Sequence, residues 1–330
     1  MTHILPNKKT ATLILPNTHN VSIKILLDAK ETAAWTDSSS EGDDPKVLHE
    51  RLCLIGNSLK RLIKEGQPHV KSTEKTGPHD MVTEMDKGIE LLFRTWLSDY
   101  YPHHKVIGEE YENKSITTSD IVWHIDPIDG TANYVEGSSQ VAIHLGCVKD
   151  GKPWVSYVGL PFFNKTYSGF FSSEMHAFPK INYKNNAVNV FGTEYLPHRK
   201  IEDTLFKKVC EKKGASPYQA KSIGYTILQL LEGNVSAFYK PRIKPWDMIA
   251  PLEILWFNQK DNWDIELFIP SQKNSQTWIS VSPFDNSEET VSHINSELKK
   301  DVRIGHLVIT KKNETDLKEY LIRKMMAIDE

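Results

Sequence analysis

Cysteine is scarce in this chain of 330 residues, which contains only Cys53, Cys147 and Cys210. The three lie far apart, in none of the spacings typical of a metal site, and an odd number cannot all pair with one another. We therefore expect neither a disulfide framework nor a cysteine-based zinc site. The three thiols are predicted to lie in the core or on the surface of a protein in a reducing compartment.

The chain also lacks a long apolar run and a strong charge of either sign. No window approaches the ~20 apolar residues of a membrane span, and the amino-terminal "MTHILPNKKTATLILPN" is too interrupted for a signal peptide. The formal net charge of -3 supplies no basic field for a nucleic-acid polymer or an anionic membrane. We therefore predict a cytoplasmic protein without nucleic-acid or membrane partners, in which any phosphate is recognised by local groups.

Length and composition predict about two globular domains after a short extension. The extension, residues 1–45, contains the echo "HILPNKKT" and "LILPNTHN", then the alternating "VSIKILLDA", which together predict a hairpin or an arm. Its end, "TDSSSEGDDP", has the composition of a linker. The role of this extension is left open.

Two predicted domains follow, over residues 46–185 and 186–330. The first begins with amphipathic helices over about 45–65 and 80–100, and continues with the strands "KVIGEE" and "DIVWHI" and an antiparallel meander. The second combines helices in "IEDTLFKKVCEKK", "SIGYTILQLLEG" and "WDMIAPLEILWF" with short strands, and ends with the strand "RIGHLVIT" and the helix "ETDLKEYLIRKMM". Sheets covered by segregated helices are typical of an α+β protein.

The segment "WHIDPIDGTANY" places two carboxylates, Asp126 and Asp129, on either side of a proline and an isoleucine. A turn is one interpretation, because Asp-Gly after a proline is ordinary turn chemistry. In the other interpretation, proline restricts the backbone so that both carboxylates and the Ile128 carbonyl face one site. Gly130 and Thr131 would then open a helix whose amide groups point at a phosphate.

Further acidic residues end strands or open helices. Glu109 and Glu110 end "VIGEE", and Asp247 opens the helix of "PWDMIAP". Each has an ordinary explanation alone, as a solvated strand end or a helix cap. Together, this many carboxylates suit Mg²⁺ or Mn²⁺ better than zinc. His103 and His104, which follow Pro102, are expected to be solvated.

Four motifs, in order, resemble the inositol monophosphatase family of Mg²⁺-dependent, lithium-sensitive phosphatases. They are "DMVTEMD" (80–86), "IGEE" (107–110), "WHIDPIDGTANY" (123–134) and "PWDMIAP" (245–251), and the resemblance covers about 46–330, with a weaker match in the last third. The resemblance implies an α+β fold of the sugar-phosphatase type, a five-layered αβαβα sandwich with the site between two sheet-containing halves. It also implies a phosphoric monoester hydrolase acting on a small phosphorylated metabolite, often as a homodimer.

The resemblance further implies roles for individual residues. Two or three Mg²⁺ ions, with Mn²⁺ as a substitute, would be held by Glu109, Asp126, the Ile128 carbonyl, Asp129 and Asp247. Asp86 and Thr131, with Glu109, would carry the catalytic step by orienting and deprotonating the attacking water. The phosphate or the rest of the substrate would contact Gly130, Thr131, Lys75 and Lys240.

Two departures from the family pattern leave the substrate open. No glycine pair follows "WDMIAP", and Lys240 stands where the family often has an acid that contacts inositol hydroxyls. Inositol monophosphate or a related sugar phosphate is the first expectation. A 3'(2'),5'-bisphosphate nucleotide and histidinol phosphate are the alternatives within the family. A regulatory homologue that binds metal but turns over weakly is the alternative of another class.

Overall fold

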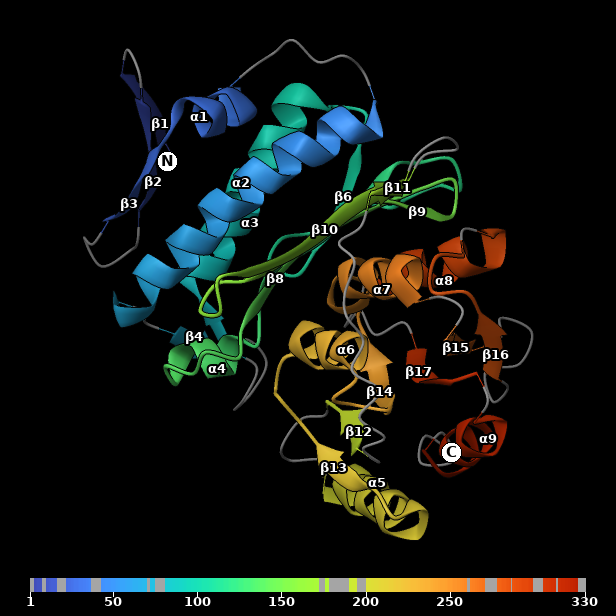
Figure 1. Cartoon of the computed structure of the whole chain (residues 1–330). Helices are drawn as coiled ribbons and strands as arrows, with labels where there is room; N and C mark the ends of the chain where they lie inside the picture. The colour runs from blue at the N-terminus through green and yellow to red at the C-terminus, as the bar shows by residue number, and fades with distance from the viewer. Residues whose placement is uncertain are drawn as a thin grey trace.

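The computed structural model describes residues 3–7, 10–16, 22–36, 43–69, 72–74, 81–171, 176–177, 190–194, 200–259, 262–270, 278–285, 287–298, 305–312 and 314–325. The helices are α1 (Ala29–Thr36), α2 (Pro45–Gly66), η1 (Gln67–His69), α3 (Glu84–Tyr100), α4 (Thr131–Val135), α5 (Lys200–Lys213), α6 (Ile223–Glu232), α7 (Pro245–Gln259), α8 (Glu288–Glu297) and α9 (Thr315–Met325). Figure 1 shows their arrangement around the sheets.

The first six-stranded sheet has the strand order β11-β10-β9-β8-β7-β6. Its strands are β6 (Lys105–Gly108), β7 (Val122–Asp129), β8 (Ala142–Lys149), β9 (Lys152–Leu160), β10 (Lys165–Phe171) and β11 (His176–Ala177). β8, β9 and β10 form the predicted antiparallel meander, whereas β6 and β7 run parallel. The parallel pair is what brings two acidic strand ends to one edge of the sheet.

The second six-stranded sheet has the strand order β13-β12-β14-β17-β15-β16. Its strands are β12 (Val190–Thr193), β13 (Ser216–Tyr218), β14 (Ala237–Ile243), β15 (Trp263–Pro270), β16 (Trp278–Val281) and β17 (Gly305–Lys311). All described strands of the first sheet precede the predicted domain boundary at residue 185, and all those of the second follow it. The boundary itself stays a prediction.

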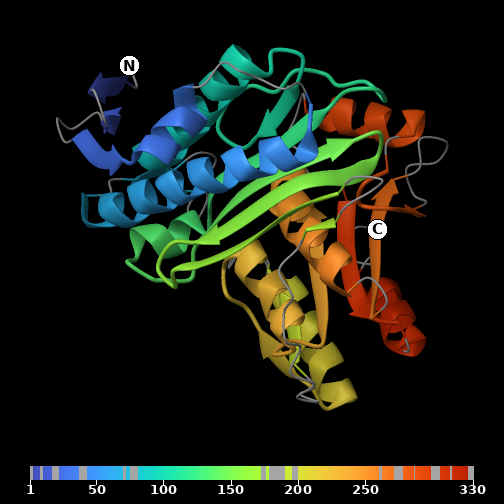
Figure 2. The ribbon, with the colours of Figure 1, turned by 45° about the horizontal axis from the view of Figure 1, so that its top comes forward.

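Side chains alternate along the strands and thereby define five layers. In β8, Ile143 and Leu145 pack in one core with α2 and α3, whereas Ala142 packs in a second core with α6 and α7. In β17, Leu307 belongs to that second core, and Val308 packs on the other side with α5 and α9. In Figure 2, α2 lies along one face of the first sheet and α7 along the other. The predicted five-layered αβαβα sandwich is thus confirmed.

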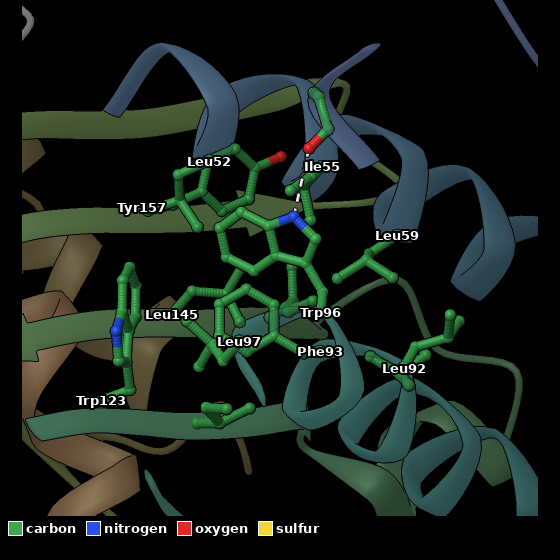
Figure 3. Close-up of a cluster of buried hydrophobic side chains, with 14 of the residues drawn as sticks. Leu52, Ile55, Leu59, Leu92, Phe93, Trp96, Leu97, Trp123, Leu145 and Tyr157 are labelled. Carbon is green, nitrogen blue, oxygen red and sulfur yellow. Dashed lines mark hydrogen bonds between the residues drawn. The ribbon is translucent and has the colours of Figure 1, made fainter. Parts of the chain in front are cut away.

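The first core is built around Trp96 of α3 (Figure 3). Its ring lies against Phe93 at 5.4 Å between ring centroids, and its indole N–H donates to the Ala34 carbonyl at 3.1 Å. Leu52, Ile55 and Leu59 enter this core at the helical spacing seen in the sequence. Each buried leucine or isoleucine contributes roughly 2 kcal/mol of hydrophobic stabilisation. The core holds α2 and α3 on the sheet whose edge carries the acidic residues.

The amino-terminal extension forms a three-stranded antiparallel sheet, β1 (His3–Asn7), β2 (Thr10–Pro16) and β3 (Ser22–Leu27). The echoed segments pair with each other, with His3 opposite Ile14, so the hairpin prediction is confirmed. The sheet is followed by α1, a helix that the sequence pattern did not predict, and α1 packs on α2. The central part of the predicted linker, residues 37–42, lies outside the described residues.

Other predictions hold with shifted boundaries. The second predicted helix begins at Glu84 rather than near residue 80, because Met81–Thr83 forms β5 and pairs with β4 (Ser72–Glu74). All three cysteines are free, as expected. Across the described ranges no helix is long and apolar enough to cross a membrane.

Glu253 is a buried acid in the middle of α7. Neither of its carboxyl oxygens has a hydrogen-bond partner of good geometry within the described ranges. Burial raises the pKa of Glu253 well above its ordinary value, and the Ser156 hydroxyl and the amides of Trp154 and Cys147 only partly oppose this rise. The Ser156 hydroxyl instead donates to the Ala250 carbonyl at 3.0 Å. The core therefore contains Glu253 as a neutral acid.

We expect Glu253 to contribute a loss of unfolding free energy at pH 8 relative to pH 5, and Glu253→Gln to remove that contribution. Above its ordinary pKa of 4.5 the unfolded chain ionises Glu253 while the folded protein keeps the proton. The free energy of unfolding then falls by up to ~1.4 kcal/mol per pH unit until the pH reaches the raised pKa of Glu253. Below pH ~4.5 Glu253 is protonated in both states and causes no such fall. Urea unfolding at the two pH values measures the difference.

The control for this prediction is Glu319→Gln, because the Glu319 side chain is 60% exposed. It should keep the pH dependence of the wild type. An unchanged pH dependence in Glu253→Gln would show that Glu253 ionises in the folded protein.

Candidate active site

The parallel pairing of β6 and β7 places Glu109 beside Asp126. Gly108, the last residue of β6, lies opposite Ile125, so the next residue on each strand is an acid. Strands that run parallel end at the same edge of a sheet, and both acids therefore face the same region. The sequence motifs "IGEE" and "HIDPID" thus lie side by side.

The turn after β6 is fixed by a buried carboxylate of α3. Glu90 accepts a hydrogen bond from the Glu110 amide at 2.8 Å and pairs with Arg94 at 2.7 Å. Gly108 leaves room for it, since a Cβ there would lie 2.3 Å from Glu90 Oε1. Asn113 completes the turn through the N–H and the carbonyl of Gly108, both at 2.8 Å. The backbone around Glu109 is therefore held from both sides.

Asp126 lies at the centre of the acidic residues. β7 continues through Pro127 to Asp129, and one extra residue between Asp126 and Asp129 forms a bulge opposite β8. A proline within a sheet is typical of such a bulge, so this segment is a distorted strand end rather than an isolated turn. Asp126 Oδ1 accepts from the Ile128 amide at 3.0 Å.

Burial, above all, raises the pKa of Asp126 well above its ordinary range. Four other carboxylates add to this rise, those of Glu109, Asp129, Asp247 and Asp86. These five acids repel one another, and a divalent cation would relieve that repulsion. This oxygen-rich donor set therefore fits Mg²⁺ or Mn²⁺.

Asp247 lies in the first turn of α7, with Pro245 as the first helical residue. Burial raises the pKa of Asp247 to about 6, while Lys244 and Lys240 oppose the rise and Glu109 adds to it. Lys244 also approaches Glu109, with 3.6 Å between Nζ and Oε1. Two lysines thus accompany the acidic residues on this side of the site.

The carboxylate of Asp129 is engaged by the start of α6, the N-terminal cap of which is Ser222. Asp129 Oδ2 accepts from Ser222 Oγ at 2.6 Å and from the Gly224 amide at 2.7 Å, and Oδ1 accepts from the Ile223 amide at 2.8 Å. His144 Nε2 lies 3.3 Å from Oδ2. Burial alone would raise the pKa of Asp129, but His144 and these donors outweigh it and lower the pKa.

Asp86 and Thr131 are in direct contact, with Thr131 Oγ1 3.1 Å from Asp86 Oδ1 and 3.0 Å from the Ile128 carbonyl. The hydroxyl has one proton for these two acceptors. Asp86 is fully buried and closes a capping box at the start of α3, where its Oδ2 accepts from the Thr83 hydroxyl and, at 2.9 Å, from the Thr83 amide. The cap fixes the carboxylate that faces Thr131.

Gly130 has a φ of 89°, which favours glycine, and precedes the five-residue helix α4. A Cβ on Gly130 would lie 3.0 Å from the Lys221 carbonyl. Lys240 lies on β14, half-buried, near Asp247. Lys75 lies outside the described residues.

Three residues near the acidic cluster were not predicted. Ser222 directly precedes the helical pattern "IGYTILQLLEG" and could have been found as a helix cap. Lys244 adjoins the "PWD" motif, but nothing in the sequence shows that it approaches Glu109. His144 gives no signal, because the register of β8 alone decides that its side chain faces Asp129.

Within the described ranges, a group of three possible ligand atoms, all within 4.8 Å of one another, is formed by Asp43, His103 and His104. The five acids of the site, all of them described residues, form no group of three that is this close. The five acids surround the site without three of their oxygens meeting at one point. The Asp129 carboxylate accepts hydrogen bonds from the start of α6, and the Glu109 carboxylate lies beside the Lys244 ammonium group.

The cluster of Asp43, His103 and His104 does not suit a metal, because the tautomer of His104 is already determined. The Trp123 indole N–H donates to His104 Nδ1 at 3.0 Å, so the proton of His104 is on Nε2, which donates to Asp43 at 3.2 Å. Burial lowers the pKa of His104 to about 4, which keeps the ring neutral. His103 is exposed, but the prediction that His104 is solvated was wrong, since the turn after Pro102 folds it onto Trp123.

Comparisons with known proteins identify the family of this chain. The family model "Inositol monophosphatase family" matches residues 50–256. A fructose-1,6-bisphosphatase/inositol-1-monophosphatase of Aquifex aeolicus is 32% identical over 207 residues, which cover 59% of this chain and 77% of that protein. Nus factor SuhB of Vibrio cholerae is 27% identical over 206 residues, covering 59% and 75%.

Solved structures share the fold. An IMPase of Thermotoga maritima superposes with a TM-score of 0.61 at 20% identity, covering 83% of this chain and 95% of that one. An IMPase/NADP phosphatase complexed with Mg²⁺ and phosphate gives a TM-score of 0.60 at 20% identity, with the same 83% and 95% coverage. At this identity the likeness concerns the fold alone.

Proposed function

Because this chain belongs to the inositol monophosphatase family, whose members are phosphoric monoester hydrolases, we propose that it hydrolyses a small phosphorylated metabolite with the help of Mg²⁺. The observation that carries the proposal is that four carboxylates lie close enough to a fifth, Asp126, to raise its pKa, beside the hydrogen bond between Thr131 and Asp86. The repulsion among five neighbouring acids destabilises the fold unless a cation offsets it, so folding alone does not explain why they lie together.

Glu109, Asp126, Asp129, Asp247 and the Ile128 carbonyl would hold the Mg²⁺ ions, of which the family has two or three. When bound, the metal supplies a water of lowered pKa and neutralises charge on the leaving oxygen. Asp129 keeps a lone pair on Oδ1 beyond the one that Ile223 occupies. Lithium inhibition and replacement of Mg²⁺ by Mn²⁺ belong to the same proposal.

Thr131 and Asp86 would orient the attacking water and take up its proton. A hydroxyl that donates to Asp86 presents its lone pairs to a neighbouring water, which can then donate to Thr131 while its own lone pair faces the phosphorus. Burial keeps the Asp86 carboxylate away from bulk solvent. The Gly130 and Thr131 amides, and Lys75 from outside the described residues, would bind the phosphate.

The first experiment is a phosphate-release assay over a panel of phosphorylated metabolites. Inositol 1-phosphate, a sugar bisphosphate, adenosine 3',5'-bisphosphate and histidinol phosphate are each tested with Mg²⁺ and again with excess chelator. We expect turnover that needs Mg²⁺, with inositol monophosphate or a related sugar phosphate as the leading substrate class. Absence of turnover across the panel, with Mg²⁺ still bound, would favour the regulatory alternative.

The position of Lys240 near Asp247 favours a substrate with a second anionic group. Lys240 lies near enough to Asp247 and Glu194 to oppose the rise that burial causes in the pKa of both. Its ammonium group therefore lies beside Asp247, at the edge of the acidic cluster, and we propose that it contacts the body of the substrate. Two unit charges about 4 Å apart interact by roughly 4 kcal/mol at the dielectric typical near a protein surface.

We expect Lys240→Glu to lower kcat/KM for a bisphosphate relative to inositol 1-phosphate by about one to three decades, at ~1.4 kcal/mol per decade. Steady-state rates with inositol 1-phosphate, a sugar bisphosphate and adenosine 3',5'-bisphosphate measure the ratios. Lys152→Glu, an exposed lysine at the start of β9, is the control for a change of net charge. Ratios that stay constant would mean that Lys240 serves only as a counter-charge to its acidic neighbours.

A further inference from the structure

Glu194 is a buried carboxyl residue to which the proposed reaction gives no role. It directly follows β12 and is only 4% exposed. Its Oε1 accepts from the Ala220 amide and from Thr226 Oγ1, both at 2.7 Å, and its Oε2 accepts from the Lys221 amide at 2.9 Å. All three donors belong to α6 or to the two residues before its cap. Glu194 thus attaches the start of α6 to the second sheet.

The same backbone is held from its other side by Asn133 of α4. Asn133 Nδ2 donates to the Ala220 carbonyl and to the Gln140 carbonyl, both at 2.7 Å. Between these two attachments Lys221 has a φ of 58°, in the left-handed region that is unfavourable for a residue with a side chain. Such a conformation persists where the surroundings impose it.

The residues that follow this turn are those that bind Asp129. Ser222, Ile223 and Gly224 supply its three hydrogen bonds, at 2.6, 2.8 and 2.7 Å. A carboxylate has about four lone-pair positions, so these donors decide which one remains for another ligand. A shift of the Lys221 turn would therefore move the donors and redirect Asp129.

We propose that Glu194 is a positioning residue for Asp129. By holding the Ala220 and Lys221 amides, it keeps the start of α6 where its donors turn the Asp129 carboxylate toward the site. The inference rests on the proposed function in taking Asp129 as a metal ligand. The proposal gives Glu194 no contact with substrate or metal, since its hydrogen bonds are with Ala220, Lys221 and Thr226.

The test begins with Glu194→Gln. A glutamine has a single acceptor oxygen, so its NH₂ group would face one of the backbone N–H donors, whatever the protonation of the glutamate it replaces. We expect kcat to fall by about ten- to a hundredfold, with little change in KM, and the affinity for Mn²⁺ to weaken by a similar factor. Mn²⁺ binding is followed by electron paramagnetic resonance, without substrate.

A rescue by Lys221→Gly separates positioning from general loss of stability. Glycine adopts φ near 58° without strain, so the turn needs Glu194 less. In the Glu194→Gln background we expect Lys221→Gly to restore both kcat and Mn²⁺ affinity by about three- to tenfold. The matched control is Asn164→Gly, at φ 51° in the turn between β9 and β10. It relieves the same kind of strain at a distance and should restore neither quantity.

A Glu194→Gln protein with wild-type kcat and Mn²⁺ affinity would overturn the proposal, as would equal rescue by the two glycine substitutions. If Glu194→Gln does not fold, Thr226→Val removes a single donor to Glu194 and should weaken Mn²⁺ binding by a smaller factor; wild-type binding would then count against the proposal. If the wild type hydrolyses no substrate, the proposed function fails, and the Mn²⁺ measurements still decide the role of Glu194.

Discussion

Asp126→Asn is expected to lower kcat/KM by on the order of a thousandfold or more, because the loss of one metal ligand removes several kcal/mol of transition-state stabilisation. The folded structure should survive. An asparagine oxygen can still accept the hydrogen bond that the Ile128 amide gives to Asp126 at 3.0 Å. Burial and the neighbouring carboxylates raise the pKa of Asp126 and so favour its neutral form in the absence of metal, and asparagine is neutral as well.

The variant should therefore be at least as stable as the wild type without metal, while gaining less stability from added Mg²⁺. Melting temperatures with Mg²⁺ and with chelator, beside phosphate release, measure both effects. Asp99→Asn removes an exposed carboxylate of α3 and is the control, with activity and Mg²⁺ response expected to match the wild type. An Asp126→Asn enzyme with normal activity, or a wild type fully active in chelator, would contradict the metal assignment.

The sequence predicts the acidic residues of the site because each one ends or begins an element with a readable pattern. Glu109 and Asp126 follow apolar strand segments, and Asp247 follows the proline that opens α7. That Glu109 and Asp126 come together follows from the parallel pairing of β6 and β7, which the patterns of single strands cannot show. Local sequence patterns thus predict which acidic residues belong to the site, whereas the sheet topology decides that they lie close together.

The environment of Asp129 could not be predicted in the same way. Its donors Ser222, Ile223 and Gly224 lie about ninety residues later in the chain, at the start of a helix that the sequence did predict. The sequence can predict that Ser222 caps α6. Which carboxylate accepts the hydrogen bond of its hydroxyl depends on how α6 packs between the two sheets, and the sequence does not show this. His144 depends likewise on the register of β8.

The elements that were missed have weak patterns of their own. α1, "AKETAAWT", has eight residues and owes its place to packing on α2. α8 begins after Ser287 with two glutamates and has few apolar residues, so no helical stripe marks it. In both, tertiary contacts rather than periodicity decide the structure.

The second large effect is expected at Thr131. Thr131→Val keeps the shape of the side chain but removes the hydroxyl that contacts Asp86 at 3.1 Å. We expect kcat to fall roughly a hundredfold or more with KM nearly unchanged, because a group that positions water acts mainly in the transition state. Thr131→Ser restores the hydroxyl and should recover most of the rate. A variant that raised KM alone would place Thr131 in substrate binding.

Asp86→Asn tests whether the two residues act as a unit. Alone it should lower kcat by a similar factor, and because Asp86 also accepts from the Thr83 amide at 2.9 Å in the capping box, it should cost ~1 kcal/mol of stability. Combined with Thr131→Val, the loss in kcat should be close to that of one substitution, since either one already removes the route by which a water proton reaches the carboxylate. Losses that multiply would mean that Asp86 and Thr131 act independently, with Asp86 serving only to cap α3.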